Sequence, residues 1–276
     1  MYLQPKARFR EEYMTRDMVD TRDDKTLSQG TIFNCAYSKN YPYQEILGLV
    51  ISARCDIANQ RKVKFYNYIP AIPFEQWRDK ESWELLKDQT YNSINKSVNE
   101  LIIKSKFSIH NLTVYGYDRI LEIIKKENRL KPKEIDRLID LKMKLDLLCS
   151  HRKYECIAKE FPRELSKIVD DIIKNKSSDY FFIDNLEGYG ALIVNLREIR
   201  ELDLNVAKGL PNGINIDEIE SYPGLNPNVK NKFCSIVGQL KSPYIELLMQ
   251  RFSNNFTRIG VNDPHESLLT LVMEIA

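Results

Sequence analysis

The sequence lacks several features that would by themselves identify it as a membrane, secreted or nucleic-acid-binding protein. It has no apolar run long enough to cross a bilayer, which needs about 20 residues, and its residues 268–273 are typical of the longest hydrophobic stretches. Residues 1–10 are polar and basic without an apolar centre, so no secretory signal is expected. The 41 basic and 39 acidic residues leave a net charge of +2, which gives no overall case for nucleic acid. We therefore expect no membrane partner.

Cysteine is scarce and dispersed. The five cysteines lie at wide spacings, which predicts reduced thiols in a cytoplasmic protein rather than a disulfide framework. Cys149, His151 and Cys156 resemble part of a zinc site, but a second pair of ligands is missing. The alternative for this segment is a helix whose cysteines face the core. We expect no metal site and no cofactor.

The sequence also lacks the common catalytic signatures. It contains no G-x-x-x-x-G-K-[ST] loop, no H-E-x-x-H helix, no G-x-S-x-G elbow, no kinase motif set and no dinucleotide-binding fingerprint. These absences exclude the commonest nucleotide-dependent, zinc-protease and hydrolase classes. What remains is a composition of 43% hydrophobic and 29% charged residues, typical of a globular protein.

The chain divides into three zones that differ in their pattern of apolar residues and in their content of glycine and proline. The first zone, residues 27–74, contains strand-like segments at residues 30–36, 46–51 and 63–73. The second, residues 75–178, is helical: its single glycine is Gly116, and apolar residues recur at helical spacing after Pro132. The third begins at residue 179 and returns to strands, with an extended loop expected over residues 208–229 and a helix after Pro243.

These zones predict an α+β fold. A sheet made from the first zone alone would leave unpaired edges and a thin core, whereas the later strands can complete it. We therefore expect a small SH3-like, partly closed β-barrel built from residues 27–74 and 179–262. Residues 75–178 form a central helical insertion in this prediction, and a C-terminal helix follows the barrel.

The stretch Gly48-Leu-Val-Ile-Ser-Ala-Arg-Cys-Asp-Ile57 is an apolar strand that ends in polar groups. Ser52, Arg54 and Asp56 are the candidate catalytic residues. Cys55 as a nucleophile would need a nearby base, and no histidine has a matching spacing. The structural alternative makes Cys55 a buried residue at the strand end, with Asp56 accepting backbone N–H bonds in the turn.

Two further groups of charged residues have open interpretations. Arg251 and Arg258 bracket aromatic residues near the C-terminus, and either pair with Asp56 or join Arg54 in an anion pocket. Basic residues gather over residues 125–133, but acidic residues interleave with them downstream. This pattern favours a solvated helical face over a nucleic-acid footprint.

Part of the sequence resembles the opening of the PemK/MazF-type toxin barrel. The resemblance rests on Gln29-Gly-Thr-Ile-Phe33, Gly48-Leu-Val-Ile-Ser52 and Asn67-Tyr-Ile-Pro-Ala-Ile72. Thr31 stands where the toxins carry an acidic residue, and Ile46-Leu47 where they carry the Arg-Pro beside their RNA-cleaving site. The resemblance implies a small barrel and, as one alternative, an endoribonuclease.

More of the chain resembles a group of bacterial proteins that share Ser-x-x-Cys-Asp-Ile and have no assigned reaction. The matching features here are Ser52–Ile57, the late Asn195-Leu-Arg197, and a terminal helix with Ser242-Pro-Tyr and Phe256-Thr-Arg-Ile-Gly260. The resemblance implies a shared scaffold and a setting among mobile-element or anti-phage genes. We expect a non-enzymatic interaction or regulatory module with a protein partner. The alternative is a PemK/MazF-like endoribonuclease or RNA-binding protein that uses Ser52, Arg54 and Asp56.

Overall fold

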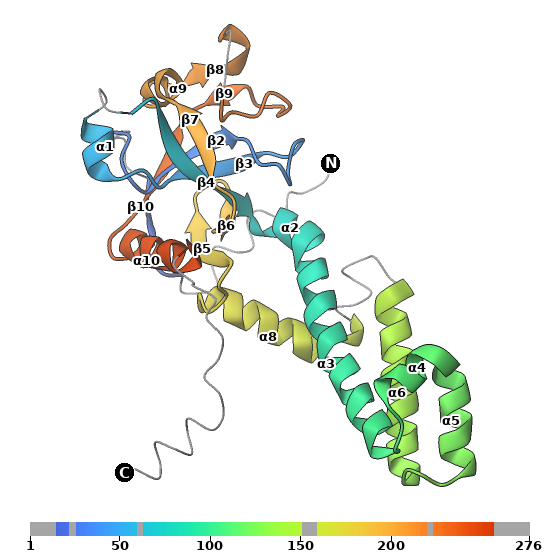
Figure 1. The fold of residues 1–276 in the computed structure, drawn as a ribbon. Helices are drawn as coiled ribbons and strands as arrows, with labels where there is room; N and C mark the ends of the chain where they lie inside the picture. Colours follow the sequence, from blue (N-terminus) through green and yellow to red (C-terminus); the bar gives the residue numbers. More distant parts are fainter. Residues whose placement is uncertain (1–14, 22–25, 60–62, 151–158, 220–222, 257–276) are drawn as a thin grey trace, which may run out of the picture. The chain divides into compact units, whose positions relative to one another are not determined.

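The computed structural model describes residues 15–21, 26–59, 63–150, 159–219 and 223–256. It divides into two compact units. One contains Ile72–Ser177 and Phe182–Ile193, and is mainly helical. The other contains Thr15–Ala71, Ser178–Phe181 and the described residues from Val194 onward, and holds most of the sheet. The helical zone is thus inserted between early and late strands of the chain (Figure 1).

The fold is α+β with a barrel-like sheet, as the sequence predicts. The eight-stranded sheet has the order β1-β10-β2-β3-β4-β6-β5, and β7 also pairs with β4. The pairings of β10 with β1 and β2, of β3 with β2 and β4, and of β7 with β4 are antiparallel. The strands are β1 (Val19–Asp20), β2 (Thr31–Ala36), β3 (Ile46–Val50), β4 (Phe65–Pro73), β5 (Tyr180–Leu186), β6 (Gly190–Asn195), β7 (Arg200–Asp203) and β10 (Ile236–Leu240).

Strands β2 and β3 form the centre of the core, and every residue in both is buried. A continuous apolar strand such as β3 is expected where both faces are covered. Gly48 of β3 is paired with Phe33 of β2, and the Phe33 ring lies over the glycine. A Cβ at position 48 would lie 2.4 Å from two carbon atoms of that ring, so the close contact requires glycine.

Strand β10 joins the two ends of the described chain. Leu240 pairs with Val19, and Gln239 pairs with Thr31. The Gln239 side-chain oxygen accepts a 2.8 Å hydrogen bond from the fully buried Thr31 hydroxyl. Thr31 therefore has a role in holding the sheet together.

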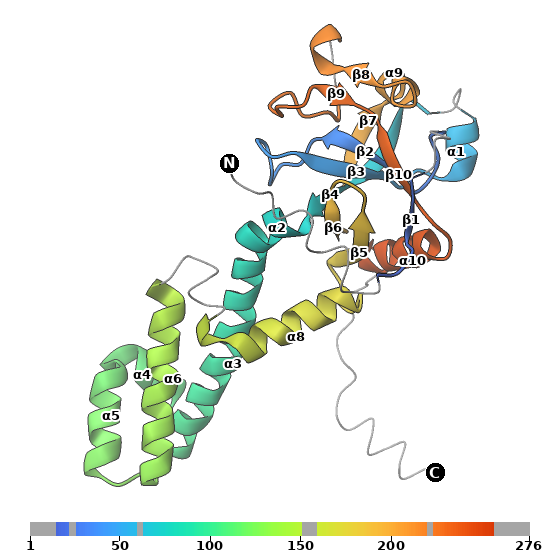
Figure 2. The same cartoon turned by 180° about the vertical axis from the view of Figure 1, so that it is seen from behind.

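The helical unit contains a long helix, α3, with several shorter ones. Helix α3 buries one side at four-residue intervals, as in Leu86, Thr90, Ile94 and Val98, which is the spacing of an amphipathic helix. Helices α4, α5 and α6 lie side by side in both views (Figures 1 and 2). The helices are α2 (Phe74–Trp77), α3 (Trp83–Lys104), α4 (Ile109–Tyr115), α5 (Tyr117–Lys126), α6 (Pro132–Ser150) and α8 (Pro162–Ile173), with a π-helical turn at Arg78–Ser82.

Shorter elements complete the barrel-containing unit. The stretch expected to be an extended loop, residues 208–229, instead begins in a helix and continues through a short strand and a 3₁₀ turn. The elements are α1 (Arg54–Ala58), α9 (Leu204–Gly209), β8 (Ile214–Asn215), the turn Ile216–Glu218, β9 (Phe233–Cys234) and α10 (Tyr244–Phe256). Among the described residues, no helix is both long and apolar enough to span a membrane.

Candidate functional site

Strand β3 ends at Val50, and Ser52 stabilises the turn that follows through hydrogen bonds to the backbone of Asn67. The Ser52 N–H donates to the carbonyl oxygen of Asn67 at 3.3 Å, and the Ser52 hydroxyl accepts a 2.7 Å hydrogen bond from the Asn67 N–H. These contacts extend the association of β3 with β4 beyond their last register pair, Val50 with Tyr68. Ser52, one of the candidate catalytic residues, is therefore tied into the sheet.

Arg54, Cys55 and Asp56 lie in the first turn of α1, and all are exposed. The expectation that Cys55 is buried is wrong, because the chain turns directly into a helix whose buried residue is Ile57. Asp56 also does not cap the turn. It lies inside α1, where its N–H donates to the Ala53 carbonyl at 3.0 Å.

Arg54 is turned toward the C-terminal helix. Its guanidinium lies 3.6 Å from the carboxylate of Glu246 in α10, and both side chains are largely exposed. An ion pair this open to water contributes less than about 1 kcal/mol. Arg251 also lies on α10, is half-buried, and has its pKa lowered by desolvation. Arg258 lies outside the described residues, so the pairing of Asp56 with either arginine stays a prediction.

The three candidates have separate partners. A general base and a phosphate-binding cation must reach the same substrate atoms. Ser52 is bonded to β4, Arg54 contacts α10, and the Asp56 carboxylate receives a weak 3.8 Å contact from the Cys55 thiol. In the described ranges the single histidine, His110, belongs to the helical unit. The exit of β3 is thus an exposed corner rather than an enclosed catalytic centre.

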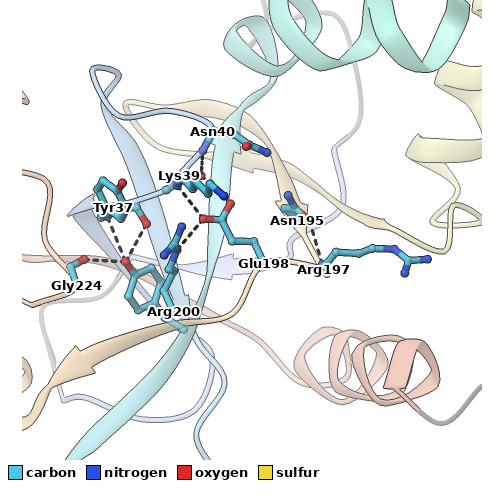
Figure 3. Close-up of polar contacts among 10 residues, drawn as sticks. Tyr37, Lys39, Asn40, Asn195, Arg197, Glu198, Arg200 and Gly224 are labelled. Atoms are coloured by element: carbon cyan, nitrogen blue, oxygen red, sulfur yellow. Dashed lines mark hydrogen bonds and ion pairs between the residues drawn. The ribbon is translucent and has the colours of Figure 1, made fainter. Parts of the chain in front are cut away.

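A denser polar cluster surrounds Glu198, in the turn between β6 and β7 (Figure 3). The Glu198 carboxylate accepts hydrogen bonds from the Ser38 hydroxyl at 2.7 Å and from the Lys39 N–H at 2.9 Å. It also forms a 2.7 Å ion pair with the guanidinium of Arg200, which lies 5.0 Å from the centre of the Tyr37 ring. Both carboxylate oxygens are occupied, so Glu198 is arranged to hold two chain segments together.

The hydroxyl of Tyr68 adds a third segment to this arrangement. It accepts a 3.2 Å hydrogen bond from the Tyr37 N–H and donates to the Gly224 carbonyl at 2.7 Å (Figure 3). Burial raises the pKa of Tyr68 far above its usual value, so the hydroxyl keeps its proton and remains a donor. We refer to Tyr37, Ser38, Lys39, Tyr68, Glu198, Arg200 and Gly224 as the Glu198 cluster.

The Asn195-Leu-Arg197 motif lies beside this cluster, and its polar contacts are structural. The Asn195 side chain accepts a hydrogen bond from the Arg197 N–H at 3.0 Å. The buried Leu196 donates its N–H to the Asp179 carbonyl at 2.9 Å, and Arg197 forms a 2.7 Å ion pair with the Asp179 carboxylate. The motif therefore joins the end of β6 to the residue that precedes β5.

The helical unit exposes apolar side chains around α4. Ser108 caps α4 through reciprocal hydrogen bonds with Asn111, and Gly116 ends the helix at a φ of 76°. None of the residues of α4 is buried, so local capping rather than core packing defines this helix. The exposed fractions are 59% for Ile103, 47% for Ile109, 58% for Val114 and 60% for Tyr115. We refer to these apolar residues as the α4 surface.

The metal and nucleic-acid hypotheses gain nothing from the described residues. Cys149 is exposed rather than directed at the core, and the other two members of its set, His151 and Cys156, lie outside the described ranges. Within those ranges no group of three or more potential ligands could hold a metal ion. Arg129 of the basic run forms an ion pair with Glu127 at 2.6 Å, as expected on a solvated face of mixed charge.

Comparison with known proteins adds no constraint on the site. No protein-family model, curated protein or solved structure matches the chain.

Proposed function

We propose that this chain is a non-enzymatic protein-interaction module that binds its partner through the α4 surface. The observation that supports the proposal most directly is the helix itself: α4 is capped at both ends yet buries none of its residues. Exposed apolar side chains that gather on one segment are typical of interaction sites. A helix held by its own caps presents them with little ordering cost on binding.

The energetics favour a protein partner with an apolar groove. Fully burying a large apolar side chain contributes about 1.5–3 kcal/mol, and Ile109, Val114 and Tyr115, each about half exposed, would each contribute part of this when covered. Isolated helices as short as α4 are marginal in water, so its caps and its contacts with α3 and α5 are what keep it ordered for a partner. The side chains of Lys106 and His110 are exposed beside this surface and would suit acidic groups at the rim of the groove.

A site-specific crosslinking experiment tests the proposal. A photo-reactive amino acid is placed at Val114 and, as a matched control, at the exposed Lys125 of α5 in the same unit. We expect a specific protein adduct from position 114 and none from position 125. The adduct is identified by mass spectrometry, and the partner is purified and its affinity measured by calorimetry.

The purified pair then provides the decisive comparison. Ile109→Ser with Val114→Ser should weaken binding at least tenfold, since two apolar contacts are lost. Lys125→Ser with Lys126→Ser should leave binding within twofold. Equal crosslinking from both positions, or unchanged affinity in the Ile109/Val114 variant, would contradict the proposal.

The endoribonuclease remains the rival function, and one observation favours it. Arg54 and Asp56 are both exposed on the same helical turn, where a phosphate could reach them. The anti-phage or mobile-element setting rests on the sequence resemblance alone and suits either function.

A further inference from the structure

Two buried cysteines from distant parts of the chain lie beside each other in the barrel-containing unit. Cys35 is in β2 and Cys234 is in β9, and both are free thiols. Asn34 fastens the two strands: its side chain bonds to the Phe233 carbonyl at 2.9 Å and accepts from the Ser235 N–H at 2.6 Å. The residues that flank Cys234 are thus held against the residue that precedes Cys35.

The two sulfur atoms face the same short stretch of backbone. The Cys35 sulfur lies 3.4 Å from the carbonyl oxygen of Asn231 and 3.5 Å from that of Phe233, and the Cys234 sulfur lies 3.9 Å from that of Lys232. The neighbouring Cys35 thiol and burial together raise the pKa of Cys234 above its usual value. The two side chains therefore lie beside the same backbone stretch, and the exposed fractions are only 4% for Cys35 and 0% for Cys234.

We propose that Cys35 and Cys234 are a modification site, at which a hydroperoxide forms a reversible disulfide between β2 and β9. The site is independent of the α4 surface, which belongs to the other unit. It requires only the two thiols in contact and an oxidant of the hydrogen peroxide class.

The steps balance without any further reactant. The Cys35 sulfur, after losing its proton, attacks one oxygen of the peroxide; the O–O bond breaks, water leaves, and Cys35 becomes a sulfenic acid. The Cys234 sulfur then attacks the Cys35 sulfur; the S–S bond forms, the S–O bond breaks, and the departing hydroxide leaves as water with the Cys234 proton. Two electrons pass from the thiols to the peroxide. Cys35 takes the first role because it is 4% exposed and Cys234 is fully buried, so the peroxide reaches the Cys35 sulfur more readily.

The disulfide would join the two-stranded sheet of β8 and β9 covalently to strand β2. Strand β9 pairs with β8 through Cys234 with Ile214 and Phe233 with Asn215, which makes a separate two-stranded sheet. In the reduced protein, hydrogen bonds such as those of Asn34 hold this small sheet to β2. A covalent bond at Cys234 would restrict the opening of β8 and β9.

Mass spectrometry of the full chain tests the proposal. Cys55, Cys149 and Cys156 are replaced by serine, so that only the two proposed cysteines remain, and the folded protein is treated with hydrogen peroxide. We expect an intramolecular species lighter by two hydrogen atoms, peptides joined through Cys35 and Cys234, and full reversal by dithiothreitol. Amide hydrogen exchange over residues 231–236 should slow at least tenfold in the oxidised form.

Single substitutions of the two cysteines are the controls for this experiment. Cys35→Ser and Cys234→Ser in this background should each abolish the loss of two hydrogens, and circular dichroism verifies that each variant is folded. If one variant does not fold, peptide mapping of the oxidised wild-type chain gives the pairing directly. Separate oxygen additions on the two cysteines, absence of reaction in the folded protein, or a wild-type disulfide through Cys55, Cys149 or Cys156 would overturn the proposal.

Discussion

Glu198 and Arg200 form an ion pair at 2.7 Å in which the side chains are only 14% and 28% exposed. The same carboxylate accepts hydrogen bonds from Ser38 and Lys39, 160 and 159 residues earlier in the chain. A carboxylate with this many donors contributes more than a surface ion pair does, since removing its charge leaves partly buried donors without their acceptor.

Glu198→Gln should therefore lower the free energy of unfolding by about 1–3 kcal/mol. Urea denaturation monitored by circular dichroism measures the change. Glu201→Gln is the matched control, because Glu201 is an exposed residue of neighbouring β7 and its loss should cost less than about 0.5 kcal/mol. Equal effects of the two substitutions would mean that the Glu198 cluster does not stabilise the fold.

Tyr68→Phe should destabilise the protein at neutral pH by about 1–3 kcal/mol, because the Tyr37 N–H and the Gly224 carbonyl lose their hydroxyl partner. The difference should depend on pH. Burial raises the folded-state pKa of Tyr68 above the ordinary value of 10.0, so its stabilising contribution is complete below pH 10 and is lost as the pH rises above it.

At pH 11 the wild-type protein should therefore have lost about 1 kcal/mol more than Tyr68→Phe, each measured relative to its own stability at pH 8. Urea denaturation of both proteins at the two pH values gives this comparison. Parallel losses in the two proteins would show that Tyr68 ionisation is not linked to unfolding.

Gly48→Ala should lower stability by about 1–3 kcal/mol through overpacking, since the new Cβ would meet the Phe33 ring at 2.4 Å. Combining it with Phe33→Leu removes the ring, so the double variant should be more stable than the sum of the two single effects predicts. Thermal and urea denaturation of the four proteins complete the cycle. Strict additivity would contradict the close packing of these residues.

Arg54→Ala and Asp56→Ala should each change the free energy of unfolding by less than about 0.5 kcal/mol, because both side chains are exposed. The interaction-module proposal further expects no cleavage of labelled single-stranded RNA by the wild-type protein. Cleavage by wild type that is lost in these folded variants would establish the ribonuclease instead.

The sheet was predictable because its strands are marked by local patterns. The apolar run at residues 46–51 and the alternating run at residues 63–73 correspond to β3 and β4, and Pro132 begins α6 as expected. Within residues 208–229 the loop prediction missed the short strand β8 and the 3₁₀ turn after it, because glycines, prolines and asparagines resemble a loop and the pairing of β8 with β9 is not local.

The site was less predictable because its defining contacts are not local. Cys55 looked like a strand-end core residue, and only the immediate turn into α1 brings Ile57 inward in its place. Nothing in the residues around Glu198 indicates its bonds to Ser38 and Lys39, which depend on how distant segments of the barrel meet. The proximity of Cys35 and Cys234 was hidden for the same reason, since the wide spacing of the cysteines carried no pairing signal.

The pairing of β10 with β2 also determines when the barrel can be completed during synthesis. Thr31 and its side-chain partner Gln239 are 208 residues apart, so β2, β3 and β4 leave the ribosome long before β10 exists. Until then β2 has an open edge that can pair with another chain. Closing so long a loop gives the barrel a high contact order and slow folding. The edge of β2 that faces β10 therefore stays unpaired until residues 236–240 have been made.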